Sequence, residues 1–531
     1  MRKLYYILMT ACAALFTGCD KYLDTLPDNR TDIDSESKVL KLLGSAYFTN
    51  EPLFVAEYMS DNVDNYGLNN PNTSRFADQV YSWSDVTEAD NECPEYFWED
   101  AYRSIATANE VLHAIEGLGG TTTQNLREAK AEALLCRAYT HFMLVNLFCL
   151  NYNKETSQTD LGIPYVTKPE TTIGVKYERG TVAEVYQQIE RDLQEALPMV
   201  GDAHFNDAAA AVKYHFNQRA AYAFACRFYL YYEQWDKAIE YANRCLGSSP
   251  ASMLRDWKAT SEMVQQSDAI TQHYIDATLN CNLMLMTAYS YMGLTFGPYR
   301  YLSRYSHGAY LAATEDGEAE NIWGRDVFYQ DMSTYSATNL DKVIFWKLPY
   351  LSEYYDAVSG TGYYRTVYPA FTADECLLNR AEAYVMTRQF DKAAADLTLW
   401  MQNIVKTLKV LTPESIQAFY GNPDLKYCYS DEKGIESTIK KHLHPAFAID
   451  EEGSVQETML QCVLGFRRLE TLQTGMRWYD IKRYGIEIVR RVMNEAGRPE
   501  SRTDYLKVDD PRRAVQIPPR VRTAGMTPNP R

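Results

Sequence analysis

One stretch, residues 217–250, has the pattern of two antiparallel helices. Apolar residues recur at three- and four-residue spacing on both sides of Glu233–Gln234, which predicts two amphipathic helices joined by a tight corner. Gly247 and Pro250 end the second helix, because Gly accepts a left-handed cap and Pro lacks a donor N–H. Small side chains on the first helix let another helix approach closely, so we expect the hairpin to pack within a larger helical stack (Ala220, Ala221, Ala223 and Ala225).

The chain repeats this hairpin 155 residues later. Residues Glu233–Ala238 match Arg388–Ala393, and Tyr229 falls on Tyr384 at the same offset. The run Cys376–Met401 is therefore predicted to be a second copy of the hairpin.

Each copy has an aromatic residue followed by D-K-A, which resembles a tetratricopeptide unit. In the first copy Pro250 lies twelve residues after Ala238, as such a unit requires, whereas the second copy has Val405 at that place. We expect a mostly α-helical fold in which tetratricopeptide-like hairpins carry long, irregular, aromatic-rich insertions.

Length and charge exclude some classes of protein. At 531 residues the chain is long enough for several domains or one large one, and its net charge of −17 with no basic block argues against nucleic-acid binding. Eleven cysteines without any C-x-x-C argue against a zinc site, and those on apolar helical faces are expected to be free, buried thiols. No run beyond residue 19 is long and apolar enough to span a membrane.

The first nineteen residues have the pattern of a secretory signal. Arg2 and Lys3 precede an apolar centre, and Thr17-Gly18 precede Cys19, which resembles a bacterial lipoprotein processing site. If so, the mature chain begins at a lipidated (palmitate-type) Cys19 and carries a charge of −17 − 2 = −19. Phe16 stands where such sites usually have Leu, and the alternative is an ordinary cleaved signal with a chance Cys.

Helical periodicity alternates with irregular segments along the chain. Helices are predicted near residues 38–47, from Pro94 onward, over 126–150, after the Thr181/Glu184 capping box to Leu197, and over about 455–473. Residues 50–95, 151–178, 253–370 and 408–455 show no sustained helical period, and the first and third of these are rich in aromatic residues. Long ordered loops in a compact protein are usually functional.

Several separated motifs resemble those of the SusD/RagB family, the surface nutrient-binding lipoproteins of Bacteroidetes. They occur in the family's order and together cover residues 19–531, with one departure: Thr474 replaces a usual second acid, while Glu470 is kept. The motifs are Cys19 with DKYLD, Trp98–Asn109, Glu132–Tyr139, Thr181–Leu193, Arg380–Ala383, Arg468–Arg483, and Ile517-Pro518 with Asn529-Pro530.

The resemblance implies a signal peptide (1–18), a lipidated tether (19–37) and one mostly helical domain (38–531) on four tetratricopeptide-like hairpins. Its scaffold would be about 95–250 and 371–405, its ligand-face insertions about 50–94 and 253–370, and its C-terminal block about 455–531. It also implies a lipid-anchored, surface-exposed outer-membrane protein that binds glycans without cleaving them or using a cofactor. Such a protein would form a lid over a SusC-like TonB-dependent channel.

Two insertions offer the side chains that hold sugars. A sugar ring presents an apolar C–H face and a rim of hydroxyls, so it is bound by an aromatic plane and by polar groups around it. Packing in the core or a loop is the competing explanation for each aromatic, and for Trp98 it is favoured. The candidate ligand residues are Asp61, Asn65, Tyr66, Arg75, Trp83, Tyr289, Tyr291 and Trp323.

No catalytic motif is present: G-x-S-x-G, H-E-x-x-H and the P-loop are all missing. His442 and His444 form an H-L-H for which a loop before Pro445 is favoured over a metal pair. Charged residues of the C-terminal block are interpreted as structural pairs (Glu470, Arg477, Asp480 and Arg483, with Trp478). Two alternatives to glycan capture remain: a helical-repeat interaction scaffold of the outer membrane, and a glycan hydrolase.

Overall fold

The structure is a computed structural model of the whole chain. It describes residues 33–89, 92–170, 172, 175–205, 211–299, 303–325, 327–330, 333–337, 340–356, 358–359, 361–429 and 434–531. The predicted signal segment, Cys19 and most of the tether lie outside these residues.

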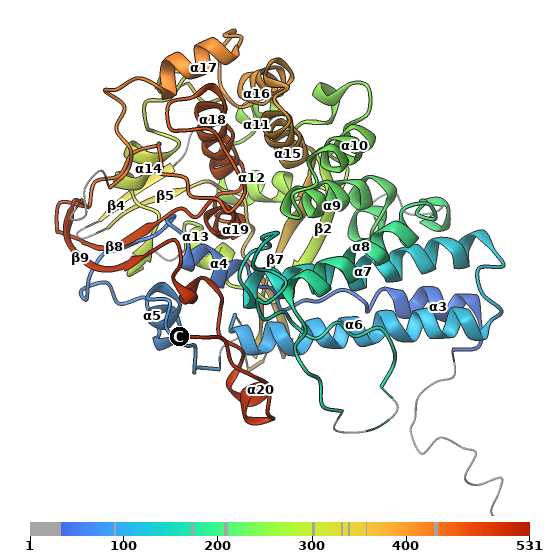
Figure 1. Cartoon of the computed structure of the whole chain (residues 1–531). Helices are drawn as coiled ribbons and strands as arrows, with labels where there is room; N and C mark the ends of the chain where they lie inside the picture. Colours follow the sequence, from blue (N-terminus) through green and yellow to red (C-terminus); the bar gives the residue numbers. More distant parts are fainter. Residues whose placement is uncertain are drawn as a thin grey trace, which may run out of the picture.

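A stack of helices runs through the molecule, with α7 lying between α6 and α8 (Figure 1). Nearly every residue of α7 is buried, because helices pack on several of its sides. Successive helices pack on one another, which confirms the predicted mostly α-helical fold. The stack comprises α6 (Pro94–Gly117), α7 (Gln124–Phe148), α8 (Val182–Ala196), α9 (Gln218–Tyr231), α10 (Trp235–Leu246), α15 (Ala373–Met386), α16 (Phe390–Ile404) and α18 (Val455–Glu470).

The two repeated hairpins have the same corner geometry. Glu233, between α9 and α10, has φ +57°, and Arg388, between α15 and α16, has φ +59°. In each corner the next residue's N–H donates back to a tyrosine carbonyl at 2.8 Å, Gln234 to Tyr229 and Gln389 to Tyr384. The identical bonds at the identical offset confirm that the second hairpin is a copy of the first.

Local signals at helix starts are also confirmed. Pro94 is the first residue of α6. A backbone N–H at this position has no acceptor within the helix, so the helix loses no hydrogen bond by having Pro there. Thr181 caps α8 by accepting from the Glu184 N–H, and the Glu184 carboxylate accepts from the Thr181 N–H. These two helices position the N-terminal part of the stack.

Three small sheets lie beside the stack. The first has the order β3-β1-β8-β9, with β1 and β8 parallel and the other pairs antiparallel; the second is β2-β7-β6 and the third β4-β5, both antiparallel. The strands are β1 (Asp64–Asn65), β2 (Asn282–Ala288), β3 (Tyr305–Ser306), β4 (Ser333–Ala337), β5 (Leu340–Ile344), β6 (Leu351–Asp356), β7 (Thr361–Thr372), β8 (Ile488–Met493) and β9 (Pro499–Leu506).

Segments expected to be irregular contain short helices as well as strands. All seven residues of α4 are buried, so no amphipathic pattern marks it in the sequence. Ser74 caps α5 by accepting from the Ala77 N–H at 3.1 Å. The remaining helices are α3 (Glu36–Leu43), α4 (Leu53–Met59), α5 (Arg75–Tyr81), α11 (Trp257–Ser261), α12 (Ser267–Tyr274), α13 (Met292–Phe296), α14 (Ala309–Glu315), α17 (Pro413–Tyr420), α19 (Met476–Arg483) and α20 (Pro519–Thr523).

One hydrophobic core connects the stack with the insertions and the C-terminal block. The nine cysteines in the described part of the chain are all buried and free, as predicted. None of the helices that the structure describes is both long enough and apolar enough to cross a bilayer.

Candidate functional site

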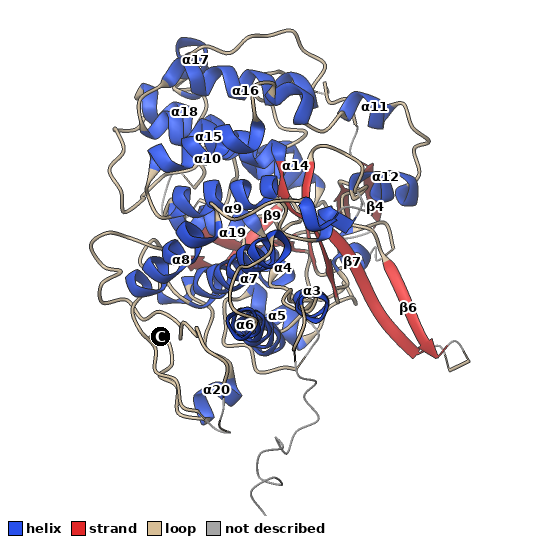
Figure 2. Cartoon of the chain, turned by 90° about the vertical axis from the view of Figure 1, so that its right-hand side faces the viewer, coloured by secondary structure: helices blue, strands red, loops and turns tan. Residues whose placement is uncertain are grey.

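The antiparallel ribbon of β6 and the first half of β7 extends beyond the helical body (Figure 2). The second half of β7 pairs with β2, so the base of the ribbon is fixed to the core. Tyr363 and Tyr364, near the start of β7, are 48% and 45% exposed. Because successive strand residues point to opposite faces, the two tyrosines lie on different sides of the ribbon.

On one face Tyr363 meets Tyr289, which directly follows β2. Their ring centroids are 5.3 Å apart in an edge-to-face arrangement. Arg365, two residues after Tyr363 on the same face, lies 4.7 Å from the centre of the Tyr289 ring and donates to its hydroxyl at 2.9 Å. The Tyr289 N–H donates to the Thr49 carbonyl at 2.9 Å, which ties this face to the N-terminal insertion.

On the other face three tyrosines follow one another. The Tyr364 and Tyr350 ring centroids are 5.4 Å apart, and those of Tyr350 and Tyr299 are 5.0 Å apart. Tyr299 is 40% exposed, and its hydroxyl donates to Asp268 of α12. Both faces therefore present aromatic rings to solvent with charged groups beside them, the combination that sugar recognition needs.

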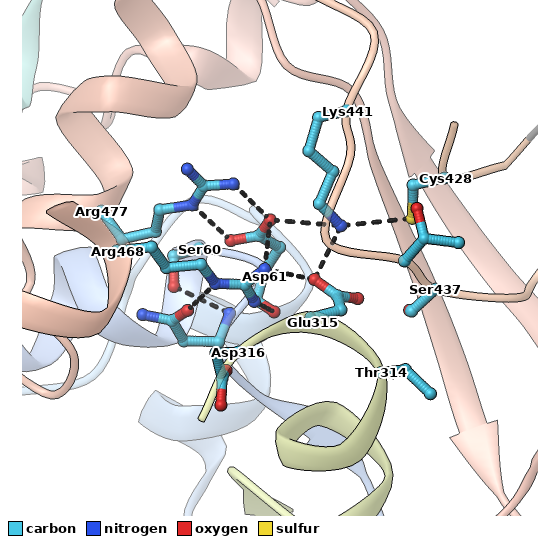
Figure 3. A network of polar contacts seen from close by, with 12 residues as sticks. Ser60, Asp61, Thr314, Glu315, Asp316, Cys428, Ser437, Lys441, Arg468 and Arg477 are labelled. Atoms are coloured by element: carbon cyan, nitrogen blue, oxygen red, sulfur yellow. Dashed lines mark hydrogen bonds and ion pairs between the residues drawn. The ribbon is translucent and has the colours of Figure 1, made fainter. Parts of the chain in front are cut away.

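Asp61 lies inside a buried ionic network rather than on a surface (Figure 3). Both its carboxylate oxygens accept from Arg477 at 2.9 Å, and Arg468 and Lys441 lie 3.6 and 3.8 Å away. Lys441 and Arg468 also bind Glu315 of α14. The Asp61 side chain is 3% exposed, so its partners in this structure are these cations.

The network sets the charge state of its acids. Burial alone would raise the pKa of Asp61, but the charges of Arg468 and Arg477 outweigh it and hold that pKa well below its usual range. In the same way Lys441 and Arg468 outweigh burial and lower the pKa of Glu315 to about 2. Both carboxyls are therefore ionised at neutral pH and attract the surrounding cations.

Trp83 and Tyr66 also lie inside, each 2% exposed. The Trp83 indole N–H donates to the Met59 carbonyl at 2.9 Å, and the Arg490 guanidinium is 4.2 Å from its ring centre. Tyr66 packs against Met493. A stacking platform needs a ring face open to solvent, so we leave both residues and Asp61 out of the proposed ligand surface.

Trp323 and Tyr291 lie in different surroundings. Trp323 is 8% exposed, and its ring centroid is 5.0 Å from that of Phe466 on α18. Tyr291 is half-buried, its N–H donates to Glu92 at 2.7 Å, and its ring meets Phe54 edge-on at 5.5 Å. Both residues therefore contact buried groups of other segments.

The two predicted insertions come together through backbone pairing and through buried ring contacts such as that of Tyr81 with Tyr305, whose centroids are 4.2 Å apart. β1 pairs with β3, and the Tyr66 N–H donates to the Arg304 carbonyl at 2.7 Å. Asn65 is half-buried and accepts from the Gly67 N–H at 2.8 Å. Arg75 is exposed and pairs with Glu88 at 3.2 Å. Asn65 and Arg75 thus make these contacts within their own insertion.

The C-terminal block forms a second buried ionic cluster. Glu382 of α15 binds Arg467 and Arg483, and the Tyr484 hydroxyl donates to it at 2.7 Å. Arg467 also binds Asp480 at 2.7 Å. Burial opposes ionisation, but the two arginines lower the pKa of Glu382 to about 2. These contacts agree with the structural role predicted for the block.

Glu470 differs from that expectation, because its carboxylate accepts from the Trp400 indole N–H at 3.0 Å rather than from an arginine. Burial and the nearby charge of Asp374 raise the pKa of Glu470 to about 8. Two interior cavities of about 30 Å³ adjoin it. Each has room for about two water molecules, so neither accommodates a sugar ring.

Sequence reasoning missed Tyr350, Tyr363 and Tyr364. Residues 361–364 of β7 are all exposed and residues 366–368 are all buried, so this segment has no alternation of exposed and buried positions. Its aromatic and β-branched residues directly after Gly360 are nevertheless a strand signal, and reading it would have placed two tyrosines on a ribbon. In the described part of the chain no group of three or more His, Cys, Asp or Glu residues is arranged to hold a metal ion.

Residues 21–230 match a protein-family model described as "Starch-binding associating with outer membrane". A curated relative, the SusD-like protein P2 of Formosa agariphila, is 28% identical over 171 residues. That alignment covers 31% of this chain and 30% of the relative's length.

Solved structures share the fold over nearly the whole chain. A SusD-like carbohydrate binding protein from Bacteroides vulgatus is 16% identical, with a TM-score of 0.62 over 92% of this chain and 96% of that one. A SusD superfamily protein from Bacteroides thetaiotaomicron is 17% identical, with a TM-score of 0.59 over 94% of this chain and 100% of that one.

Proposed function

Because the chain belongs to the SusD/RagB family, we propose that it is a carbohydrate-binding lipoprotein of the outer membrane. It captures an oligosaccharide at the cell surface and passes it, without cleavage, to a SusC-like TonB-dependent channel. Cys19 carries the lipid anchor in this proposal. The family model's description supports the carbohydrate and the membrane, while the channel is carried by the family resemblance alone.

The exposed tyrosines of the β6–β7 ribbon are the observation that carries the ligand site. Tyr363, Tyr364 and Tyr299 each expose 40–48% of their surface although each also contacts another ring, so their orientations are fixed before a ligand arrives. A preordered aromatic platform loses little conformational entropy on binding. Tyr289, which contacts Tyr363 and Arg365, completes the first face.

A calorimetric titration of soluble polysaccharides and oligosaccharides, including starch, mannan, xylan, pectic and host-type glycans, tests capture. We expect a selective ligand with micromolar-to-millimolar affinity. Replacing the tyrosines of one face in pairs then identifies the platform: Tyr289→Ala with Tyr363→Ala, against Tyr299→Ala with Tyr364→Ala. Removing a stacking platform costs about 1.4 kcal/mol or more, a tenfold or larger loss of affinity.

The matched control is Tyr505→Ala, a half-buried tyrosine on β9 in a different sheet. If both pairs of variants bind the selected glycan as tightly as the unaltered chain, the ribbon is not the site.

Chromatography of the glycan after long incubation separates capture from hydrolysis, because shortened products would favour the hydrolase. Binding of peptides but of no glycan would favour the interaction scaffold.

A further inference from the structure

Three rings lie in a row on the segment that precedes α18. The Tyr427 and His442 ring centroids are 4.5 Å apart with 13° between the planes, and those of His442 and His444 are 6.3 Å apart with 16°. Alternate residues of an extended chain point to the same side and are separated by about 6.6 Å, so the two imidazoles are neighbours on one face. Leu443 between them is 8% exposed and points to the core.

The backbone under this pair is held on both sides. The Cys428 N–H donates to the Lys440 carbonyl at 2.7 Å, and the Lys441 N–H donates to the Gln461 side chain at 3.1 Å. At the other end the His444 N–H donates to the Tyr484 carbonyl at 2.8 Å. The segment therefore presents both histidines from a fixed frame, which lowers the entropy lost when a ligand joins them.

A carboxylate orients one of the rings. Nδ1 of His442 is 2.6 Å from Oε1 of Glu452, and the two side chains are 36% and 46% exposed. A carboxylate accepts, so the proton of a neutral His442 is on Nδ1 and the lone pair is on Nε2. Metal-binding histidines usually have such a carboxylate on the nitrogen that does not bind the metal, because it fixes the tautomer and makes the imidazole more basic.

We propose that His442 and His444 form a two-imidazole binding site for a late first-row divalent cation, with Cu²⁺ bound more tightly than Ni²⁺ or Zn²⁺. Imidazole suits these ions, and the order of affinity follows their general preference for nitrogen ligands. Water supplies the remaining ligands. Two metal–nitrogen bonds of about 2.0–2.1 Å require the two nitrogens to lie within about 4 Å, so binding requires the exposed His444 ring to turn toward His442.

Neighbouring acids favour a cation at this place. Glu452 accepts from His442, and the Tyr427 hydroxyl donates to Glu457 at 3.3 Å. The Lys440 ammonium group lies 4.0 Å from the Tyr427 ring centre and donates to the Tyr420 carbonyl at 2.7 Å, so its hydrogen bond is made to the backbone and not to an imidazole. The site does not use the ribbon tyrosines, so it is independent of the proposed glycan capture.

Titration of the full chain, purified without a polyhistidine tag, with Cu²⁺ tests this site by calorimetry and electron paramagnetic resonance. We expect one equivalent bound through two imidazole nitrogens. His442→Ala and His444→Ala should each weaken that equivalent at least tenfold, and the double variant should lose it. His113→Ala, which removes an exposed histidine of α6, should bind as the unaltered chain does.

Glu452→Gln tests the role of the carboxylate in orienting His442 separately from metal binding by the two histidines, because the variant keeps both imidazoles. We expect it to weaken Cu²⁺ binding tenfold or more with two nitrogens still in the spectrum. The site is refuted by an unchanged stoichiometry in the double variant, by a spectrum with a single imidazole, or by loss in only one of the two histidine variants. Unaltered affinity in Glu452→Gln would refute the role given to the carboxylate.

Discussion

Arg477 holds both carboxylate oxygens of Asp61 with bonds of 2.9 Å from Nε and from Nη2, although 416 positions separate the two residues in the chain. Both side chains are almost fully buried. This bidentate pair links the end of α4 to the start of α19. It is one edge of the network that also includes Glu315, Lys441 and Arg468.

Asp61→Asn should destabilise the protein by about 3–5 kcal/mol, because removing one partner leaves buried cations without their counter-charge. Urea unfolding at pH 7 measures the change. Asp424→Asn, at an exposed position, is the control and should stay within about 0.5 kcal/mol of the unaltered chain. A variant that keeps its stability but loses glycan binding would instead give Asp61 the ligand role predicted from sequence.

Acid should lower the free energy of unfolding because it protonates Glu382. The pKa of this group is lowered from 4.5 to about 2 in the folded state, so its contribution is present above pH 4.5 and is lost as the pH falls toward 2. The difference corresponds to roughly 3 kcal/mol. The free energy of unfolding, measured from pH 6 to pH 3, should fall less steeply in Glu382→Gln than in the unaltered chain.

Glu495→Gln, at an exposed position of the C-terminal sheet, controls for that comparison and should leave the slope unchanged. Parallel pH profiles for Glu382→Gln and the unaltered chain would contradict the expectation.

Glu470 should have the opposite effect on how the free energy of unfolding depends on pH. Its pKa is raised to about 8, so between pH 4.5 and 8 the folded chain keeps a proton that the unfolded chain releases, and stability falls as the pH rises. Glu470→Gln removes this penalty while keeping an oxygen for the Trp400 N–H. Relative to the unaltered chain, the variant should gain stability from pH 5 to pH 8, as measured by thermal unfolding at both values. A constant difference would show that Glu470 is already ionised in the fold.

Trp83→Ala and Tyr363→Ala should separate stability from binding. Trp83 is buried under Arg490, so truncation should cost about 3–5 kcal/mol of stability and leave glycan affinity of the folded fraction unchanged. Tyr363 is half-exposed, so its truncation should change the free energy of unfolding little and should weaken the binding of the glycan. Unfolding and calorimetry on the same preparations measure both quantities. The reverse pattern would make Trp83 the platform.

Patterns within a few residues predicted the helical part of the fold. The corner at Glu233, the capping box at Thr181 and the first turn at Pro94 each depend on neighbours within about five positions, so the sequence shows them directly. Strand pairing, in contrast, depends on residues far away in the sequence. β1 meets β3 and β8 through residues hundreds of positions away, and no local period reports such partners.

The candidate site was harder to predict than the fold because a tyrosine or tryptophan in an irregular segment serves packing and binding equally well. Tyr289 is half-buried beside the exposed Tyr363, whereas Trp83 and Trp323 pack inside. In the sequence Asp61 is typical of a carboxylate that binds sugar hydroxyls, and only the three-dimensional structure shows the cations around it. Burial of a polar residue depends on distant partners, which composition alone does not reveal.

The pairing of α4 with the C-terminal block also determines when the protein can become stable. A ribosome adds about 5–20 residues per second, so Asp61 waits roughly 20–80 s before Arg477 has been synthesised. During that time Asp61 lacks the guanidinium that binds both its carboxylate oxygens in the folded chain. The complete network of buried charges therefore forms only after nearly the whole chain has been synthesised.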